Sequence, residues 1–264
     1  MLDLEHDLQI VDGRGGHCER PAPSAALIMQ DRFIGDIGDF EKYGLLRALA
    51  GVHPQNAPEL SLGIVWYMVP DANIDFLKNP ERFRECDPPL FDELHRLVGS
   101  NQRTIAAIEQ APIWPRGTKF FGSQAFKRVP SPESGPWIKA AVEKVAKCDL
   151  VFLDPDTGLE NRPKDPCKRE HCSYDDVRRF WERGTSLVIY QHQAQGKSQP
   201  EQMAAVADRL KEAVGTPTRP WYLHFKQRAL FVVPSPTHHD TLKARFRQFT
   251  EDWYSRAKLG NGPA

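Results

Sequence analysis

Apolar side chains recur at three- and four-residue steps in several stretches, which is the spacing of one face of a helix. The first such stretch begins at Asp39, which we take as the capping residue, and it ends at Gly51 and Pro54. The same spacing predicts further helices over 87–99, 137–147, 174–183, 199–214 and 241–254. The repeating apolar residues of the first helix are Phe40, Tyr43, Leu45, Leu46 and Leu49.

Other stretches are apolar without interruption, and they are short. They cover 62–69, 149–153 and 186–190, and each passes directly into polar residues. Uninterrupted apolar runs of this length are typical of strands covered on both faces, as in a parallel sheet. A weaker pattern predicts a strand over 104–109. Two further strands, 221–225 and 229–233, are joined by a short polar turn and predict an antiparallel hairpin.

Strands and helices alternate through the middle of the chain, so a doubly wound, mostly parallel sheet is the economical arrangement. We therefore predict an α/β fold of Rossmann-like type with an antiparallel C-terminal hairpin. Residues 1–30 contain clusters of Gly and Pro with little apolar periodicity, which indicates a flexible extension. No linker-like composition divides the remainder, so we expect a single domain over 31–258 and a frayed tail over 259–264.

Composition and charge narrow the function classes. The 264 residues include 35 basic and 35 acidic side chains, so a nucleic-acid partner would need a local basic patch. No apolar run approaches the length of a membrane span, and the first residues carry acid where a secretory signal carries base. The 5 cysteines are scattered and do not resemble a disulfide framework. We therefore expect a cytoplasmic protein with no membrane partner.

Polar residues that follow buried strands are the first candidates for a site, because ligands of open α/β sheets bind outside the carboxyl ends of the strands. The strongest signal is the segment 154–160, Asp-Pro-Asp-Thr-Gly-Leu-Glu, which follows a predicted strand. Its carboxylates Asp154 and Asp156 would accept a proton from a substrate or hold a divalent metal. Alternatively, Asp154 caps a turn and Asp156 is a solvated loop residue.

Two further segments carry candidate residues. His192 comes just after a predicted strand, where it is either a proton acceptor or a structural side chain. The segment 35–42, Gly-Asp-Ile-Gly-Asp-Phe-Glu-Lys, contains Asp36, Asp39 and Lys42. Asp39 and Lys42 are three residues apart and would form a local ion pair, or they would contact a cofactor or metal. The aspartates would repel a phosphate, so this segment is not a nucleotide phosphate loop.

Three short pieces of the chain resemble one family and occur in the same order: Asp36-Ile-Gly-Asp-Phe-Glu-Lys-Tyr-Gly-Leu-Leu, a buried strand with aromatic residues, and then Leu-Asp-Pro-Asp. This family is the large-subunit ribosomal-RNA adenine-N6 methyltransferases of the RlmJ type. They carry Gly-Asn-x-Ala-Asp-x-x-Lys-His before a helix and Asp-Pro-Pro-Tyr after a strand. The chain is also similar to a set of bacterial proteins that carry Gly-Asp-x-Gly-Asp-x-x-Lys-Tyr and Asp-Pro-Asp-Asn-Gly-Leu-Glu.

The resemblance implies a methyltransferase-like variant of the fold, with S-adenosylmethionine as the cofactor. Asp39 and Lys42 match an aspartate and a lysine that lie beside the cofactor in that family. Asp154 matches the carboxylate that accepts hydrogen bonds from the target amino group. The sequence departs from the family in three places. No glycine follows the first strand at Tyr67-Met-Val-Pro-Asp, Thr157 replaces the aromatic residue that would stack on a flipped base, and Asp156 replaces a proline.

Three functions remain open from the sequence. The first is an S-adenosylmethionine-dependent methyltransferase-like enzyme that acts on a nucleic-acid base or a smaller molecule. The second is a metal-dependent phosphoesterase or nuclease that uses Mg or Mn. The third is a non-catalytic binding domain with a degenerate pocket.

These hypotheses assign the candidate residues differently. In the first, the residues that hold the cofactor are Asp36, Asp39, Lys42 and Tyr67, and the catalytic residues are Asp154, Asp156 and His192. In the second, the metal ligands come from Asp36, Asp39, Asp154, Asp156 and Glu160.

Overall fold

The computed structural model describes residues 35–52, 59–67, 81–123, 135–160, 171–193, 199–225 and 228–257. The predicted extension over 1–30 and the predicted tail over 259–264 lie outside these ranges. None of the helices within them is long and apolar enough to cross a bilayer.

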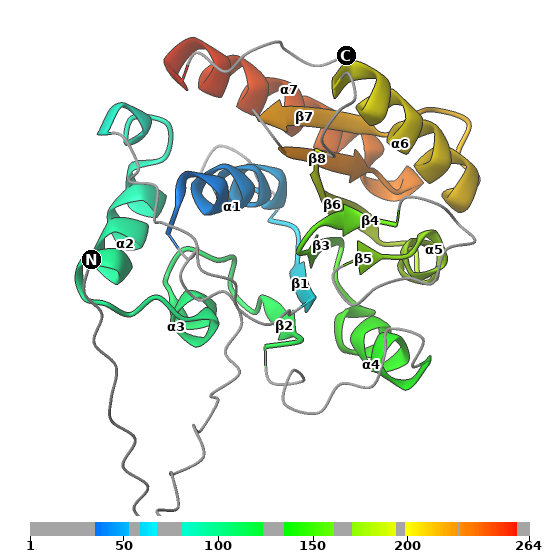
Figure 1. Ribbon diagram of the computed structural model, residues 1–264, viewed down its shortest axis with the longest axis horizontal. Helices are drawn as coiled ribbons and strands as arrows, with labels where there is room; N and C mark the ends of the chain where they lie inside the picture. The colour runs from blue at the N-terminus through cyan, green and yellow to red at the C-terminus, as the bar shows by residue number, and fades with distance from the viewer. Residues whose placement is uncertain are drawn as a thin grey trace, which may run out of the picture.

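The core of the fold is a six-stranded sheet (Figure 1). Its strands are β1 (Leu62–Tyr67), β2 (Lys119–Phe121), β3 (Leu150–Pro155), β6 (Ser186–His192), β7 (Trp221–Phe225) and β8 (Arg228–Val233). They lie in the order β2-β1-β3-β6-β8-β7. The first four are parallel, and β8 is antiparallel to both of its neighbours. A separate two-stranded parallel sheet consists of β4 (Gly158–Leu159) and β5 (His171–Cys172).

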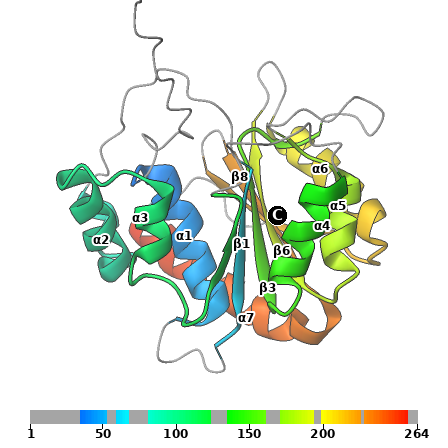
Figure 2. The ribbon, with the colours of Figure 1, turned by 90° about the horizontal axis from the view of Figure 1, so that it is seen from below.

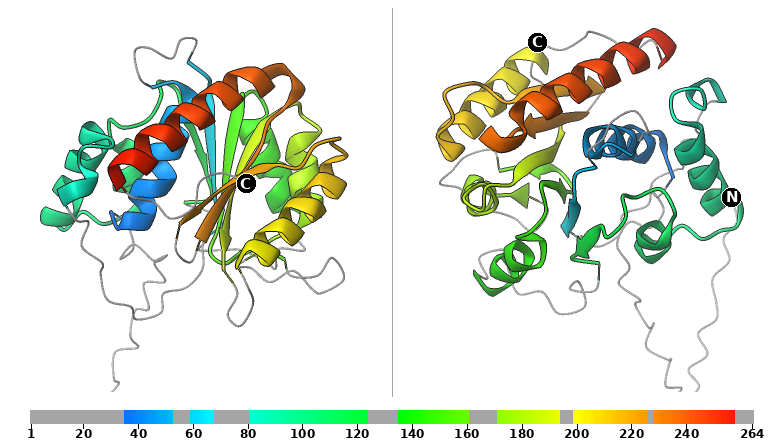
Figure 3. Two further views of the ribbon diagram at one scale, coloured as in Figure 1. Left: turned by 90° about the horizontal axis from the view of Figure 1, so that it is seen from above. Right: turned by 180° about the vertical axis from the view of Figure 1, so that it is seen from behind.

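Helices cover both faces of the large sheet, which confirms the predicted doubly wound α/β class (Figure 2). One face carries α1 (Ile37–Ala50), α2 (Pro88–Gly99), α3 (Ile105–Gln110) and α7 (His239–Ala257). The other carries α4 (Gly135–Val145), α5 (Tyr174–Trp181) and α6 (Gln199–Val214). Single turns of 3-10 helix cover Glu81–Phe83 and Pro236–His238. The long helix α7 lies alongside α1 (Figure 3).

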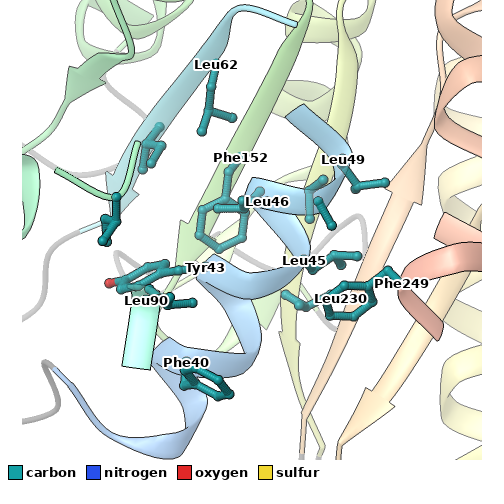
Figure 4. Close-up of a cluster of buried hydrophobic side chains, with 14 of the residues drawn as sticks. Phe40, Tyr43, Leu45, Leu46, Leu49, Leu62, Leu90, Phe152, Leu230 and Phe249 are labelled. Carbon is teal, nitrogen blue, oxygen red and sulfur yellow. The ribbon is translucent and has the colours of Figure 1, made fainter. Parts of the chain in front are cut away.

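Two apolar clusters, one on each face of the sheet, hold these layers together. Successive residues of a strand point to opposite faces, so Phe152 packs under α1 while Leu153 packs toward α4 and α5. The cluster under α1 includes the side chains of Phe40, Leu46 and Leu49 (Figure 4). The sheet therefore has a defined α1 face and a defined α4 face, and this distinction decides which polar residues can meet.

Two predicted elements need correction. The first helix begins at Ile37 rather than beyond Asp39, and its cap is Asp36, whose Oδ1 accepts the backbone N–H of Asp39 at 2.9 Å. The strand predicted over 104–109 is wrong, because residues 105–110 form α3. Thr104 caps this helix by accepting the N–H of Ala107, and the apolar residues of α3 are three apart and buried on one side.

The central strands extend further than their apolar runs. Asp154 lies within β3, opposite Trp66 of β1, so it is a strand residue and not the first residue of a loop. Likewise β6 continues through Gln191 to His192, which is paired with Arg228 of β8. Backbone pairing with a neighbouring strand continues past the point where the side chains become polar. The short strands β2, β4 and β5 were not predicted.

Candidate functional site

The carboxyl ends of β1, β3 and β6 form one rim of the sheet, and α1 begins at this rim. The helix runs back along the sheet, since the backbone carbonyl of its last residue, Ala50, accepts the N–H of Leu60 just before β1 begins. Because α1 covers only one face, it meets the rim residues that point to that face. Two residues after Phe152, Asp154 points toward α1, and Tyr190 and His192 of β6 share this direction.

Lys42, in the second turn of α1, reaches across to the end of β3. Its Nζ lies 3.1 Å from Oδ2 of Asp154 and 3.0 Å from Oδ1 of Asp39. The rings of Tyr43 and Tyr190 lie beside the ammonium, with centroids at 5.7 Å and 5.5 Å. The side chains of Lys42 and Asp154 are 15% and 10% exposed. Segments more than a hundred residues apart in sequence thus meet in a nearly buried ion pair.

Burial and charge oppose each other in this cluster. Burial lowers the pKa of Lys42, but the carboxylates of Asp154 and Asp39 outweigh burial and hold the pKa well above its ordinary value. Burial raises the pKa of Asp154 to about 6, although Lys42 acts against this rise. Burial and the nearby Asp39 carboxylate also raise the pKa of Asp36. Near neutral pH, Lys42 is therefore protonated and Asp154 is mainly ionised.

One oxygen of Asp154 is engaged by none of the described residues. Its Oδ2 accepts the hydrogen bond from Lys42. Within the described ranges, no side chain or backbone N–H donates to Oδ1. Asp39 differs, because it accepts the backbone N–H of Gly35 at 3.0 Å as well as the Lys42 ammonium. Asp39 thus has a structural role at the start of α1, whereas Asp154 keeps an acceptor atom for a ligand.

Two residues of the rim, Tyr190 and Arg228, were not among the sequence predictions. Arg228 begins β8, its Nε lies 3.7 Å from Oε2 of Glu41, and its charge opposes the rise in the pKa of Asp36. Its guanidinium lies so close to the first turn of α1 that a Cβ on Gly38 would overlap it. An available signal was the hairpin itself, because the second strand of an antiparallel pair must begin at the rim where the first strand ends.

The other predicted residues are distributed unevenly around this cluster. Asp156 is exposed beyond the end of β3, yet close enough for its charge to raise the pKa of Asp154. His192 lies at the exposed margin, where burial and the Arg228 charge lower its pKa, and its Nδ1 is 3.4 Å from the Tyr190 hydroxyl. Tyr67 is not brought to Lys42, because its side chain points to the α4 face. There its hydroxyl donates to Sγ of Cys172 at 3.3 Å.

The remainder of the 154–160 segment is held against β6. Gly158 has φ of 103°, which an L side chain rarely adopts, and it lies directly against Gln191. The Gln191 side chain accepts the backbone N–H of Leu159 at 2.9 Å. Glu160 turns away from the rim and accepts the backbone N–H of Tyr174 at 2.9 Å. Glu160 is therefore a buried structural carboxylate and does not join the predicted acidic cluster.

The geometry limits what this site can do chemically. In the described part of the chain, no three His, Cys, Asp or Glu side chains are grouped so that they could hold a metal ion. Between Asp39 and Asp154, where such an ion would have to sit, lies the Lys42 ammonium. The cluster can instead accept a hydrogen bond from an N–H or O–H group and orient that group at the rim.

Comparison of the chain with models of protein families, with curated proteins and with solved structures gave no match.

Proposed function

We propose that the chain is an S-adenosylmethionine-dependent, methyltransferase-like enzyme whose acceptor binds at Asp154. The observation that supports this most directly is the Lys42–Asp154 ion pair at the carboxyl end of β3. It joins the two segments on which the resemblance to the RlmJ-type methyltransferases rests.

The cofactor, when bound, supplies a methyl group on a positively charged sulfur. An acidic rim that contains Asp36, Asp39 and Asp154 suits such a cationic group. Methyl transfer depends on the alignment of donor and acceptor more than on a strong base, and Oδ1 of Asp154 would provide alignment by accepting a hydrogen bond from the acceptor. Residues 68–80, which follow β1, lie outside the described ranges, so the assignment of cofactor contacts rests on α1 and β3.

One predicted role changes within this proposal. Tyr67 was expected to line the cofactor site, but Trp66 is the residue at the end of β1 that shares the α1 face with Asp154. The indole N–H of Trp66 donates to Oε1 of Glu109 at 3.0 Å, which fixes the ring near the rim. Trp66 is only 1% exposed, so it supports the rim from beneath and we assign it no cofactor contact.

The test is thermal unfolding with S-adenosylmethionine, S-adenosylhomocysteine, Mg²⁺ or Mn²⁺. A ligand at about 100 times its dissociation constant should add about 2.7 kcal/mol to the free energy of unfolding. We expect both sulfur ligands to stabilise the protein and Lys42→Met to lose this response. The matched control is Asp208→Asn, which removes an exposed carboxylate on α6 that is paired with Arg219. This variant should respond as the unmodified chain does.

Three other results would contradict the proposal. A response to Mg²⁺ or Mn²⁺ that Asp154→Asn abolishes would favour the metal-dependent phosphoesterase or nuclease. No response to any of the four ligands would favour a binding domain with a degenerate pocket. A sulfur-ligand response that Lys42→Met leaves intact would place the cofactor away from α1.

A further inference from the structure

Thr157 and Ser235 each have an aliphatic hydroxyl group beside an imidazole ring. Oγ1 of Thr157 lies 2.6 Å from Nδ1 of His171, and Oγ of Ser235 lies 3.3 Å from Nδ1 of His238. The Ser235 pair is closed to a substrate, because Ser235 is only 1% exposed. The Thr157 pair is shorter, and both of its residues are partly exposed at the molecular surface.

The Thr157–His171 pair lies at the carboxyl end of the sheet but apart from Lys42. Thr157 follows β3, and His171 is the first residue of β5, which lies beside β3 (Figure 1). The next residue of β5, Cys172, packs on the α4 face of the sheet, whereas Lys42 reaches Asp154 from the α1 face. The pair is therefore separate from the site described above, and the inference does not rest on the proposed function.

The backbone on both sides of this pair is held by a hydrogen bond and by strand pairing. The backbone carbonyl of Thr157 accepts the N–H of His192 at 3.3 Å. The next residue, Gly158, lies directly against Gln191 and is opposite His171 in the parallel pairing of β4 with β5. The hydroxyl group and the imidazole are therefore positioned before any substrate binds, which is what a nucleophile and its base require.

A hydroxyl group is a weak nucleophile until a base removes its proton, and a hydrogen bond to an imidazole nitrogen prepares this step. We propose that Thr157 and His171 form an acyl-transfer centre, in which Oγ1 of Thr157 attacks the carbonyl carbon of an activated carboxylic ester. Nδ1 of His171 takes the hydroxyl proton, the alcohol leaves with that proton, and the acyl group remains on Thr157 as an ester. Water then attacks this ester and gives a proton to His171, the carboxylic acid is released, and Thr157 recovers its proton from His171.

The experiment treats the full chain with p-nitrophenyl acetate and measures p-nitrophenol release by absorbance and acetylation by mass spectrometry of proteolytic peptides. We expect an initial burst of p-nitrophenol and an acetyl group on the side chain of Thr157. Thr157→Val should lower the burst rate by about 100-fold or more, since the nucleophile and its base-assisted step are both lost. Thr157→Ser keeps a hydroxyl group and should retain the burst. The control His95→Ala, at an exposed position on α2, should match the unmodified chain.

His171 needs its own test, because a purely structural contact would also bring it to Thr157. His171→Ala should lose the burst, and added imidazole should restore it by supplying the missing base, after the rate with imidazole alone is subtracted. Thr157→Val should not respond to imidazole.

Three results would overturn the inference. They are the absence of an acetyl group on Thr157 in the unmodified chain, a burst that Thr157→Val retains, and a burst of His171→Ala equal to that of the unmodified chain. The first result needs no variant, so it decides even where a variant does not fold.

Discussion

The carboxyl group of Asp154 is nearly buried, and its ion pair with Lys42 favours the ionised form. A carboxyl group whose pKa is higher in the folded chain than in the unfolded chain binds its proton more tightly when folded. The free energy of unfolding therefore falls as the pH rises from the unfolded pKa to the folded one. For Asp154 these values are near 3.8 and about 6. Lys42 contributes nothing to this change, because its raised pKa affects stability only in strongly alkaline solution.

We expect this effect to be measurable as a difference between the unmodified chain and Asp154→Asn. Between about pH 4 and pH 6 the free energy of unfolding of the unmodified chain should fall, relative to the variant, by roughly 1–3 kcal/mol. Urea unfolding at several pH values measures this difference directly. The exposed-site variant Asp208→Asn should give a curve parallel to that of the unmodified chain. If the curve for Asp154→Asn is also parallel to that of the unmodified chain, the carboxyl group of Asp154 does not have a raised pKa and the prediction is wrong.

At the scale of single elements, the turn after β3 depends on a glycine. Gly158 combines a φ of 103° with a close approach to Gln191, in which an added Cβ would lie 2.7 Å from the side-chain amide carbon. We expect Gly158→Ala to destabilise the fold by about 2–3 kcal/mol, from backbone strain and crowding together. Gly117→Ala is the control, because Gly117 also has positive φ but has no atom within 4 Å of the added Cβ. Equal losses of stability would remove the crowding argument.

The patterns that predicted the elements also explain which ones were missed. Uninterrupted apolar runs identified β1, β3 and β6, because a strand covered on both faces needs apolar side chains throughout. The same property hides the face to which each residue points. Nothing in the run from Leu62 to Tyr67 distinguishes Trp66 from Tyr67, so Tyr67 was assigned to a side of the sheet that its ring does not share. The helix over 105–110 was missed because it is only six residues long, too short for the three-residue spacing of Ile105 and Ile108 to establish a period.

The candidate site was predictable in part for a related reason. Asp39, Lys42 and Asp154 were found because strand ends and helix starts meet at one rim in this class of fold. Arg228 was not found, because its position depends on the register between β6 and β8, in which His192 is paired with Arg228. Register depends on packing between strands and not on the local polarity of either one.

At the scale of the whole molecule, α1, the helix that carries Lys42, is held by two distant parts of the chain. The buried guanidinium of Arg47 pairs with Asp87, the cap of α2, and also donates to the carbonyl of Ile113. Near the C-terminus, Trp253 of α7 stacks on Phe40 of α1 with ring centroids 4.9 Å apart. The C-terminal helix α7 thus lies against α1, the helix that carries Lys42 and Asp39 (Figure 3).

This contact gives a test of how the last helix supports the site. Trp253 is 4% exposed and contacts α1 at Gly44, where an added Cβ would overlap its ring. We expect Trp253→Ala to lower the free energy of unfolding by about 3–5 kcal/mol, the usual cost of removing a buried aromatic side chain. Trp181→Ala, at the half-buried end of α5, should cost less, and urea unfolding of the two variants measures both. If Trp253→Ala remains folded, it should also weaken the binding of any ligand that contacts Lys42, because α1 loses part of the surface against which α1 packs. A Trp253→Ala protein with full stability would mean that α7 does not hold the site helix in place.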